Sequence, residues 1–292
     1  MTVLDTAFEA ARRRGARVVL PEQDDPRIAE ATERLVTDGL AQPVDLADVS
    51  DGQIAALVTT RGMKPAMAER LLRKPLYRAA AMVAAGEADT IVAGAVNSTA
   101  EVIKAAAMSI GLAPGVSLPS SFFLMRFPDR EMIWADCAVN TYPDADGLVA
   151  IAQASAQSAK ALLGSAQVAL LSFSTATSGS GPSVDTVREA AARTGFTGPV
   201  QGDAALNGAI AAQKGLGAGD ANVLVFPSLD AGNIAYKLAQ ELSGAQALGP
   251  FLQGFAKPVC DLSRGARVDD IVAATAVTVA LMQGSIMKAT SG

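Results

Sequence analysis

Short β-branched runs alternate with longer helical stretches along this chain, and this alternation constrains its fold more than any other feature. Parallel strands need a crossover between them, usually a helix, so the alternation predicts a largely parallel sheet covered by helices on both faces. Aromatic residues make up only 4% of the 292 residues, so the expected core is aliphatic. Strands are expected at residues 16–20, 90–93, 121–127, 132–135, 168–173 and 223–226. Helices are expected at 4–13, 26–38, 64–72, 77–85, 99–110, 145–163, 184–194, 231–242 and 269–283.

Two breaks in this pattern, near residues 114–117 and 249–250, predict domain edges. One domain would then consist of residues 1–115 plus 250–292, because the final helix returns to the first half, and residues 116–249 would form the other. A cleft between two such domains is a common place for a ligand.

The chain contains no histidine, which excludes Ser-His-Asp and Cys-His catalysis and histidine-ligated metals. Cys137 and Cys260 make neither a disulfide framework nor a zinc-binding pattern. The net charge of -5 argues against nucleic acid as a partner, although a local basic cluster could still bind an anion. We find no secretory signal and no apolar run of about 20 residues. A cytoplasmic protein with no membrane partner is expected.

The loop at residues 261–265, Asp-Leu-Ser-Arg-Gly, precedes a predicted helix and is the most informative stretch. The first N–H groups of a helix point at bound anions. Ser263 adds a hydroxyl donor, and Arg264 adds a planar, permanently charged fork suited to phosphate. Asp269 or Asp270 would lie in the first helical turn. The alternative is ordinary helix capping, in which the serine and aspartate side chains only stabilise the start of the helix and bind no ligand.

Two further loops have the composition of small anion-binding turns. Residues 92–99 end in Asn97, Ser98 and Thr99, just before a helix that carries Lys104. Residues 170–181 contain Ser174 and Thr175 in a Ser/Thr/Gly-rich loop after a strand. Either could be a simple strand–helix turn, and neither matches a P-loop or a dinucleotide fingerprint. Together the three loops favour a phosphate-bearing ligand.

Several long segments resemble the phosphate acetyltransferase / phosphate butyryltransferase family, and the match covers nearly the whole chain. They are GPFLQGFAKPVCDLSRG (249–265), ANVLVFPSLDAGNIAYKLAQ (221–240), WADCAVN (134–140), LSFST (171–175) and VAGAVNST (92–99). The resemblance implies a two-domain, three-layer α/β/α fold like that of isocitrate and isopropylmalate dehydrogenases. It places the active site in the interdomain cleft and implies a homodimer.

The resemblance also implies a reaction, the reversible transfer of an acetyl group between acetyl phosphate and coenzyme A, with release or uptake of phosphate. Coenzyme A is a substrate, and no cofactor or metal is expected. Ser263 would donate to the developing oxyanion, Arg264 would hold the phosphate, and Asp270 would take the thiol proton. The anion-binding residues assigned to substrate are Asn97, Ser98, Thr99, Lys104, Ser174 and Thr175. The alternatives are a butyryl-specific transferase and a non-catalytic acyl-CoA-binding regulator.

The chain departs from the family pattern at four positions. Asn97 stands where histidine is usual, and Lys104 and Val58 stand where arginine is usual, although Arg61 one turn later could replace the latter. Cys260 stands where asparagine is commoner. Lysine keeps the charge of arginine but loses its bidentate fork. The set of Ser263, Arg264 and Asp270 is intact, so an active enzyme is expected.

Overall fold

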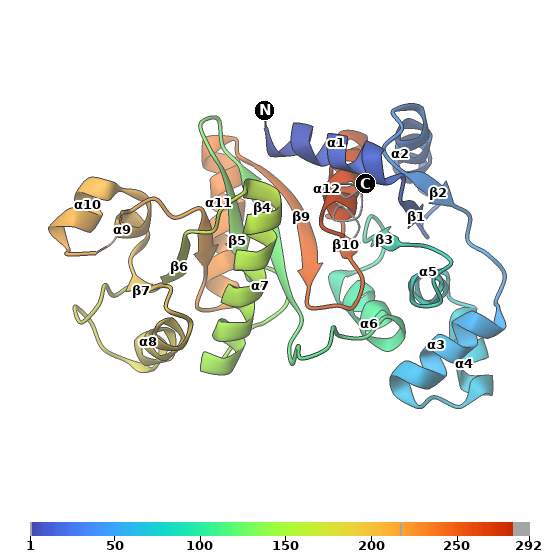
Figure 1. The fold of residues 1–292 in the computed structure, drawn as a ribbon, viewed down its shortest axis with the longest axis horizontal. Helices are drawn as coiled ribbons and strands as arrows, with labels where there is room; N and C mark the ends of the chain where they lie inside the picture. Colours follow the sequence, from blue (N-terminus) through green and yellow to red (C-terminus); the bar gives the residue numbers. More distant parts are fainter. Residues whose placement is uncertain (1, 217, 283–292) are drawn as a thin grey trace, which may run out of the picture.

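A computed structural model describes residues 2–216 and 218–282 as a mixed α/β protein (Figure 1). Its strands are β1 (Arg17–Val19), β2 (Gln42–Val44), β3 (Thr90–Ala93), β4 (Ser120–Arg126), β5 (Glu131–Ala135), β6 (Val168–Leu171), β7 (Thr197–Val200), β8 (Val223–Val225), β9 (Gln246–Gln253) and β10 (Val259–Asp261). Its helices are α1 (Val3–Arg14), α2 (Pro26–Thr37), α3 (Asp51–Arg61), α4 (Pro65–Leu72), α5 (Pro75–Ala84), α6 (Thr99–Ser109), α7 (Ala145–Leu163), α8 (Pro182–Thr194), α9 (Gly202–Leu206), α10 (Gly208–Gln213), α11 (Leu229–Ser243) and α12 (Val268–Ala280).

The strands form one sheet in the order β2-β1-β3-β10-β9-β4-β5-β8-β6-β7. The pairs among β2, β1, β3 and β10 are parallel, as are those among β5, β8, β6 and β7. The central pairs β10–β9, β9–β4 and β4–β5 are antiparallel. Six of the nine neighbouring pairs are parallel, which confirms the prediction of a largely parallel sheet, and the three antiparallel pairs lie in its centre.

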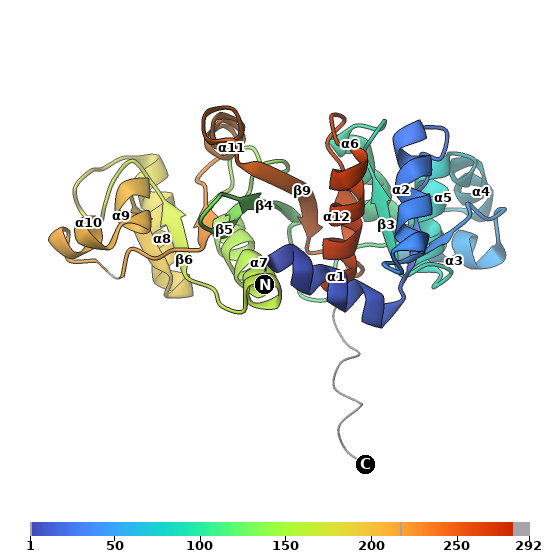
Figure 2. The same cartoon turned by 90° about the horizontal axis from the view of Figure 1, so that it is seen from above.

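Helices cover both faces of the sheet, as the three-layer prediction requires. Side chains alternate between faces along each strand. Phe122 and Leu124 of β4 join a core with α1, α2, α7, α8 and α12, whereas Phe123 and Met125 face α9 and α11. On this second face, α5 and α6 cover the other flank of the sheet. Figure 2 shows α6 and α11 on one side of the sheet, with α1 and α7 on the opposite side.

The sequence analysis missed four strands, β2, β7, β9 and β10. Of these, β9 contains the Gly249–Pro250 step taken as a domain edge. β9 pairs with β10 on one side and β4 on the other, so it joins the two halves of the sheet. Leu248 and Phe251 are buried in the core. The division into two domains stays a prediction. The expected helix 269–283 is α12, and residue 283 lies outside the described residues.

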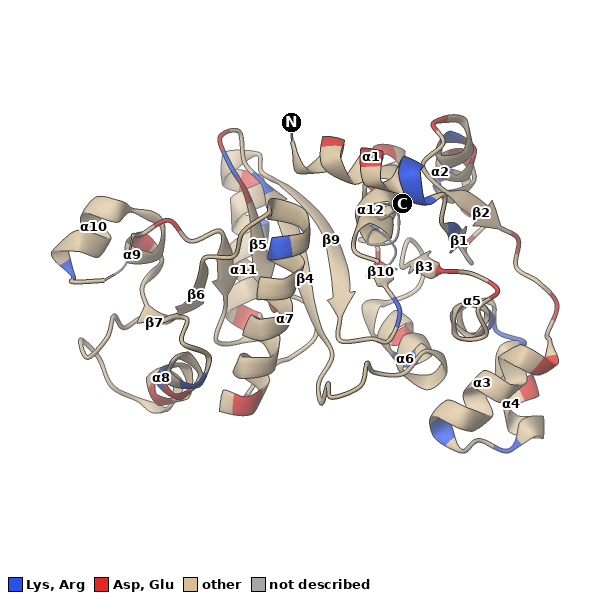
Figure 3. Ribbon diagram, in the orientation of Figure 1, with Lys and Arg blue, Asp and Glu red and all other residues tan. Residues whose placement is uncertain are grey.

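Charged side chains are spread over many elements in Figure 3, with blue and red segments on both halves. One short basic band ends α1, where Arg12, Arg13 and Arg14 occupy the last turn. Cations there interact well with the helix dipole. In the part of the chain that the structure describes, no helix combines the length and apolarity needed to cross a membrane.

Candidate functional site

Two of the three predicted loops leave the sheet side by side, because β3 and β10 are neighbouring parallel strands. The Leu262 N–H donates to the Ala93 carbonyl at 2.6 Å, and the Thr99 hydroxyl donates to Asp261 Oδ2 at 2.5 Å. Gly94 permits this approach: a Cβ atom there would lie 2.3 Å from Asp261 Oδ1, and its φ is +107°. The structure thus brings residues 97–99 and 263–264 together at one edge of the sheet.

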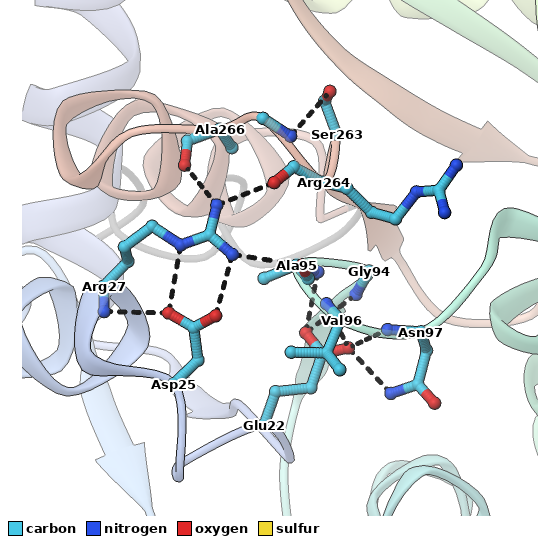
Figure 4. Close-up of polar contacts among 11 residues, drawn as sticks. Glu22, Asp25, Arg27, Gly94, Ala95, Val96, Asn97, Ser263, Arg264 and Ala266 are labelled. Carbon is cyan, nitrogen blue, oxygen red and sulfur yellow. Dashed lines mark hydrogen bonds and ion pairs between the residues drawn. The ribbon is translucent and has the colours of Figure 1, made fainter.

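The turn after β3 binds an anion, and that anion is the chain's own Glu22 carboxylate (Figure 4). Its Oε2 accepts the N–H groups of Gly94 and Ala95, at 3.0 and 2.8 Å. Its Oε1 accepts the N–H groups of Val96 and Asn97, at 3.1 and 2.8 Å, and the Asn97 side-chain amide at 2.7 Å. Successive N–H groups of this kind form an anion-binding nest. Sequence reasoning found the nest but missed Glu22, whose only local signal is its position after a buried strand.

The substrate-binding residues predicted in this turn, residues 97–99, have partners within the protein, whereas Lys104 on α6 does not pair with a described residue. Asn97 donates to Glu22, and Thr99 donates to Asp261. Ser98 caps α6 in a capping box with Glu101. Lys104 is exposed on α6 and makes no ion pair with another described residue. Their roles toward substrate stay predictions.

Ser263 and Arg264 lie on an exposed loop between β10 and α12. The Ser263 hydroxyl accepts a long hydrogen bond of 3.3 Å from the Gly265 N–H. In Figure 4 the Arg264 side chain points away from Arg27 and the Glu22 nest. Its guanidinium forms no hydrogen bond or ion pair with any residue in 2–216 or 218–282. A free guanidinium beside a serine hydroxyl at a helix N-terminus can bind a phosphate-sized anion.

Asp270, the predicted base, lies in the first turn of α12. Its Oδ2 accepts the Arg267 N–H at 3.0 Å and lies 3.6 Å from Arg267 Nε, while its Oδ1 accepts from Gln246 Nε2 at 2.8 Å. This is the capping geometry that the sequence left open as an alternative. Asp269 instead pairs with Arg34 at 2.5 Å. The role of Asp270 as a base stays a prediction.

Asp261 is a fully buried carboxyl group beneath the loop. Burial raises its pKa to about 7, the Thr99 hydrogen bond opposes this rise, and the charge of Glu22 adds to it. Its Oδ1 has no hydrogen-bond partner among the described residues. Burial also raises the pKa of the neighbouring Cys260 thiol, which favours the inert, protonated form.

Ser174 and Thr175 are buried in the loop after β6, away from the other predicted residues. Thr175 exchanges hydrogen bonds with Gln201, and Ser174 Oγ lies 3.3 Å from Ser178 Oγ. β6 lies five strands from β10 in the sheet. At about 4.8 Å per strand, this separates the two strands by roughly 24 Å, and the three antiparallel pairs between them reverse the strand direction. The structure does not bring the two loops together, and the role of Ser174 and Thr175 in substrate binding stays a prediction.

A cavity of about 350 Å³ lies elsewhere, between α3, α5 and the end of α6. Small residues and Lys257 line it, and none of the predicted site residues does. Over residues 2–216 and 218–282, no cluster of three or more acidic or thiol side chains is arranged to hold a metal ion.

Comparison with known proteins gives a consistent result. Residues 47–279 match the family model described as phosphate acetyl/butaryl transferase. The chain is 43% identical to the phosphate acetyltransferase of Paracoccus denitrificans, over 95% of this chain and 98% of that protein. Among solved structures, a phosphotransacetylase from Streptococcus pyogenes superimposes with a TM-score of 0.89 at 34% identity, covering 95% of this chain and 97% of that one.

A structure that is more distant in sequence shares only its fold with this chain. A protein from Salmonella typhimurium assigned as a 4-hydroxythreonine-4-phosphate dehydrogenase matches with a TM-score of 0.52 at 13% identity, over 91% of this chain and 99% of that one. The expected dehydrogenase-like fold is thereby confirmed. The family match, the high coverage of full-length relatives and the intact Ser263–Arg264 loop agree, and the chain belongs to the phosphate acetyl/butyryl transferase family of acyltransferases.

Proposed function

We propose that this protein is a phosphate acetyltransferase that moves an acetyl group reversibly between phosphate and the thiol of coenzyme A. The observation that carries the proposal is the 43% identity over nearly the full length of a phosphate acetyltransferase. The exposed Arg264 guanidinium beside Ser263 supports it, because a dianionic phosphoryl group needs such a partner. Acetyl is preferred over butyryl because the relatives at 35–43% identity are named phosphate acetyltransferases.

In the proposed reaction, the sulfur of coenzyme A attacks the carbonyl carbon of acetyl phosphate. The bond between that carbon and the bridging oxygen breaks, and phosphate leaves with the electron pair. Arg264 holds the phosphoryl oxygens, and Ser263 donates to the carbonyl oxygen as it becomes negative, which is worth about 3 kcal/mol. Asp270 accepts the thiol proton; its two oxygens each accept one hydrogen bond, from Arg267 and Gln246, and each keeps a lone pair for the proton.

A substrate panel tests this proposal. Thioester formation is followed with coenzyme A and acetyl, propionyl or butyryl phosphate at equal concentrations. Acetyl phosphate should give the highest kcat/KM. A preference for butyryl phosphate would make the protein a butyryltransferase. Tight binding of acetyl-CoA by calorimetry without turnover of any acyl phosphate would favour the non-catalytic regulator.

We further propose that coenzyme A is used as a substrate only, with no bound cofactor, and that the protein works in the cytoplasm. The proposed substrate supports this location, because acyl-CoA thioesters are made and used inside the cell. Cys137 and Cys260 are both free thiols, which suits a reducing compartment.

A homodimer is also proposed, with α11 as the contact. Ile234, Leu238 and Leu242 recur every four residues and are 58%, 53% and 82% exposed. Such a stripe on one helix face is typical of a protein interface. Leu238→Asp should convert a dimer into a monomer in sedimentation velocity runs, whereas the exposed-surface control Glu33→Gln should not. A monomeric wild-type protein at micromolar concentration would contradict the proposal.

A further inference from the structure

Arg27, the second residue of α2, uses all five N–H groups of its guanidinium (Figure 4). Nε and Nη2 donate to the two carboxylate oxygens of Asp25, at 3.0 and 2.7 Å. Nη1 donates to the carbonyls of Arg264 and Ala266, at 2.8 and 2.9 Å. Nη2 also donates to the Ala95 carbonyl at 3.1 Å. One side chain thus joins the start of α2, the Glu22 nest and the loop that carries Ser263 and Arg264.

The two carbonyls bound by Nη1 lie at the end of the predicted catalytic loop that leads into α12. Fixing the Arg264 carbonyl fixes the orientation of the peptide plane that follows Arg264, and with it the direction in which its side chain leaves the backbone. Fixing the Ala266 carbonyl does the same for the peptide that leads into Arg267, the N-cap of α12. Beyond Leu262, the loop's own hydrogen bonds are local, from Gly265 to Ser263 Oγ and from Ala266 to the Ser263 carbonyl.

The charge of Arg27 is already neutralised where it lies. Asp25 forms a bidentate ion pair with it, and the guanidinium lowers the pKa of that carboxyl group. Asp25 also accepts the backbone N–H of Arg27 at 2.9 Å, as the N-cap of α2. With its five donors and its charge in use, Arg27 has nothing left to offer a substrate anion. Among residues 2–216 and 218–282, the guanidinium of Arg264 has neither a hydrogen-bond partner nor an ion-pair partner, so its fork and its charge are free.

We infer that Arg27 is a positioning residue: through the carbonyls of Arg264 and Ala266 it holds Arg264 in the direction required to bind the phosphate group of the substrate. The inference rests on the proposed function and goes beyond it, because Arg27 itself contacts no substrate. A misplacement of about 1 Å in such a group can cost on the order of 100-fold in rate.

A purely structural role would give a different result, and Arg17 provides the matched control. Its guanidinium pairs with Asp89 at 2.8 Å and donates to the carbonyls of Glu87 and Gly86, at 3.0 and 2.9 Å. It therefore clamps a loop in the same way as Arg27, but that loop carries no predicted site residue. Loss of either clamp should lower stability, and only loss of Arg27 should weaken phosphate binding.

The test compares Arg27→Met, Arg27→Lys and Arg17→Met with the wild type. Acetyl-CoA is converted to acetyl phosphate at varied concentrations of inorganic phosphate. For Arg27→Met, kcat/KM for phosphate should fall on the order of 100-fold, while KM for acetyl-CoA stays close to wild type. Arg27→Lys should recover only part of the loss, because a point-like ammonium cannot replace the planar fork. Arg17→Met should keep the wild-type KM for phosphate.

A second measurement does not depend on turnover. Inorganic phosphate that binds the folded protein raises its thermal midpoint. The wild type and Arg17→Met should both show this rise, although the thermal midpoint of Arg17→Met without phosphate should be lower. Arg27→Met should show no rise. A wild type that shows the rise without turnover would contradict the proposed function and leave the role of Arg27 standing.

Two outcomes would overturn the inference. One is an Arg27→Met protein with wild-type KM for phosphate and an undiminished phosphate-induced rise. The other is a wild type with no phosphate-induced rise and no phosphate-dependent turnover. If Arg27→Met yields no folded protein, the same two measurements are made on Arg27→Lys. A wild-type KM for phosphate and a wild-type phosphate-induced rise in that variant would overturn the inference.

Discussion

Replacing Glu22 by glutamine tests whether the nest after β3 depends on an internal carboxylate. Glutamine has the size of glutamate but presents one oxygen and one NH₂ group. If its oxygen keeps the Oε1 position, the N–H groups of Val96 and Asn97 keep their acceptor. The N–H groups of Gly94 and Ala95, now bound to Oε2 at 3.0 and 2.8 Å, would face the NH₂ donor instead.

The cost follows from these two lost acceptors. A buried donor left without a partner costs about 1–3 kcal/mol, so Glu22→Gln should lower the free energy of unfolding by roughly 2–6 kcal/mol. Glu22 is 8% exposed, so water cannot readily replace the lost acceptor. Removing its charge also relieves its repulsion of Asp261, which offsets a small part of the loss. The thermal midpoint should fall by about 2–4 °C per kcal/mol.

Urea unfolding followed by circular dichroism measures this difference. Glu33→Gln is the matched control, since Glu33 lies exposed on α2 and the same change there should stay within about 0.5 kcal/mol of wild type. If Glu22→Gln unfolds at the same urea concentration as Glu33→Gln, the Glu22 carboxylate does not stabilise the nest.

Three further predictions concern ionisation and catalysis. Burial raises the pKa of Asp261 to about 7. Between its ordinary pKa of about 4 and pH 7, the unfolded chain therefore releases a proton that the folded chain keeps, and stability falls as the pH rises through this window. The stability of Asp261→Asn relative to wild type should accordingly increase from about pH 4 to about pH 7 and then level off; a difference independent of pH in urea unfolding would contradict this. Asp270→Asn should lower kcat by about 10²–10⁴-fold with the coenzyme A affinity retained, and near-normal turnover would remove Asp270 as the base. Dialysis against EDTA should leave the rate of thioester formation unchanged, and recovery only on adding back a divalent ion would show that a metal takes part.

The elements that the sequence predicted well are those whose signal is local. The predicted strand 90–93 coincides with β3, and the predicted helix 145–163 coincides with α7, which runs from an Asp144 N-cap to a glycine C-cap. β9 was missed because Gly249 and Pro250 are usually turn residues. Its strand identity comes from pairing with β4 and β10, which are distant in the sequence.

The residues of the candidate site also differ in whether a local sequence signal reveals them. Ser263 and Arg264 could be found because a polar loop before a helix is visible in a few adjacent letters. Glu22 and Arg27 could not, since neither belongs to a local motif. Glu22 binds N–H groups 72–75 residues away, and Arg27 binds carbonyls 237 and 239 residues away.

The sequence by itself determined the alternation of strands and helices, the absence of histidine chemistry, the family and the Ser-Arg loop, because each depends on residue type and short spacing. Only the tertiary structure decided that the sheet is continuous, that its centre is antiparallel, and that the nest after β3 holds Glu22. It also separated Ser174 and Thr175 from the Ser263 loop by five strands. The physical reason is that strand order and buried hydrogen bonds join residues far apart in the chain, and no local pattern records which pairs will meet.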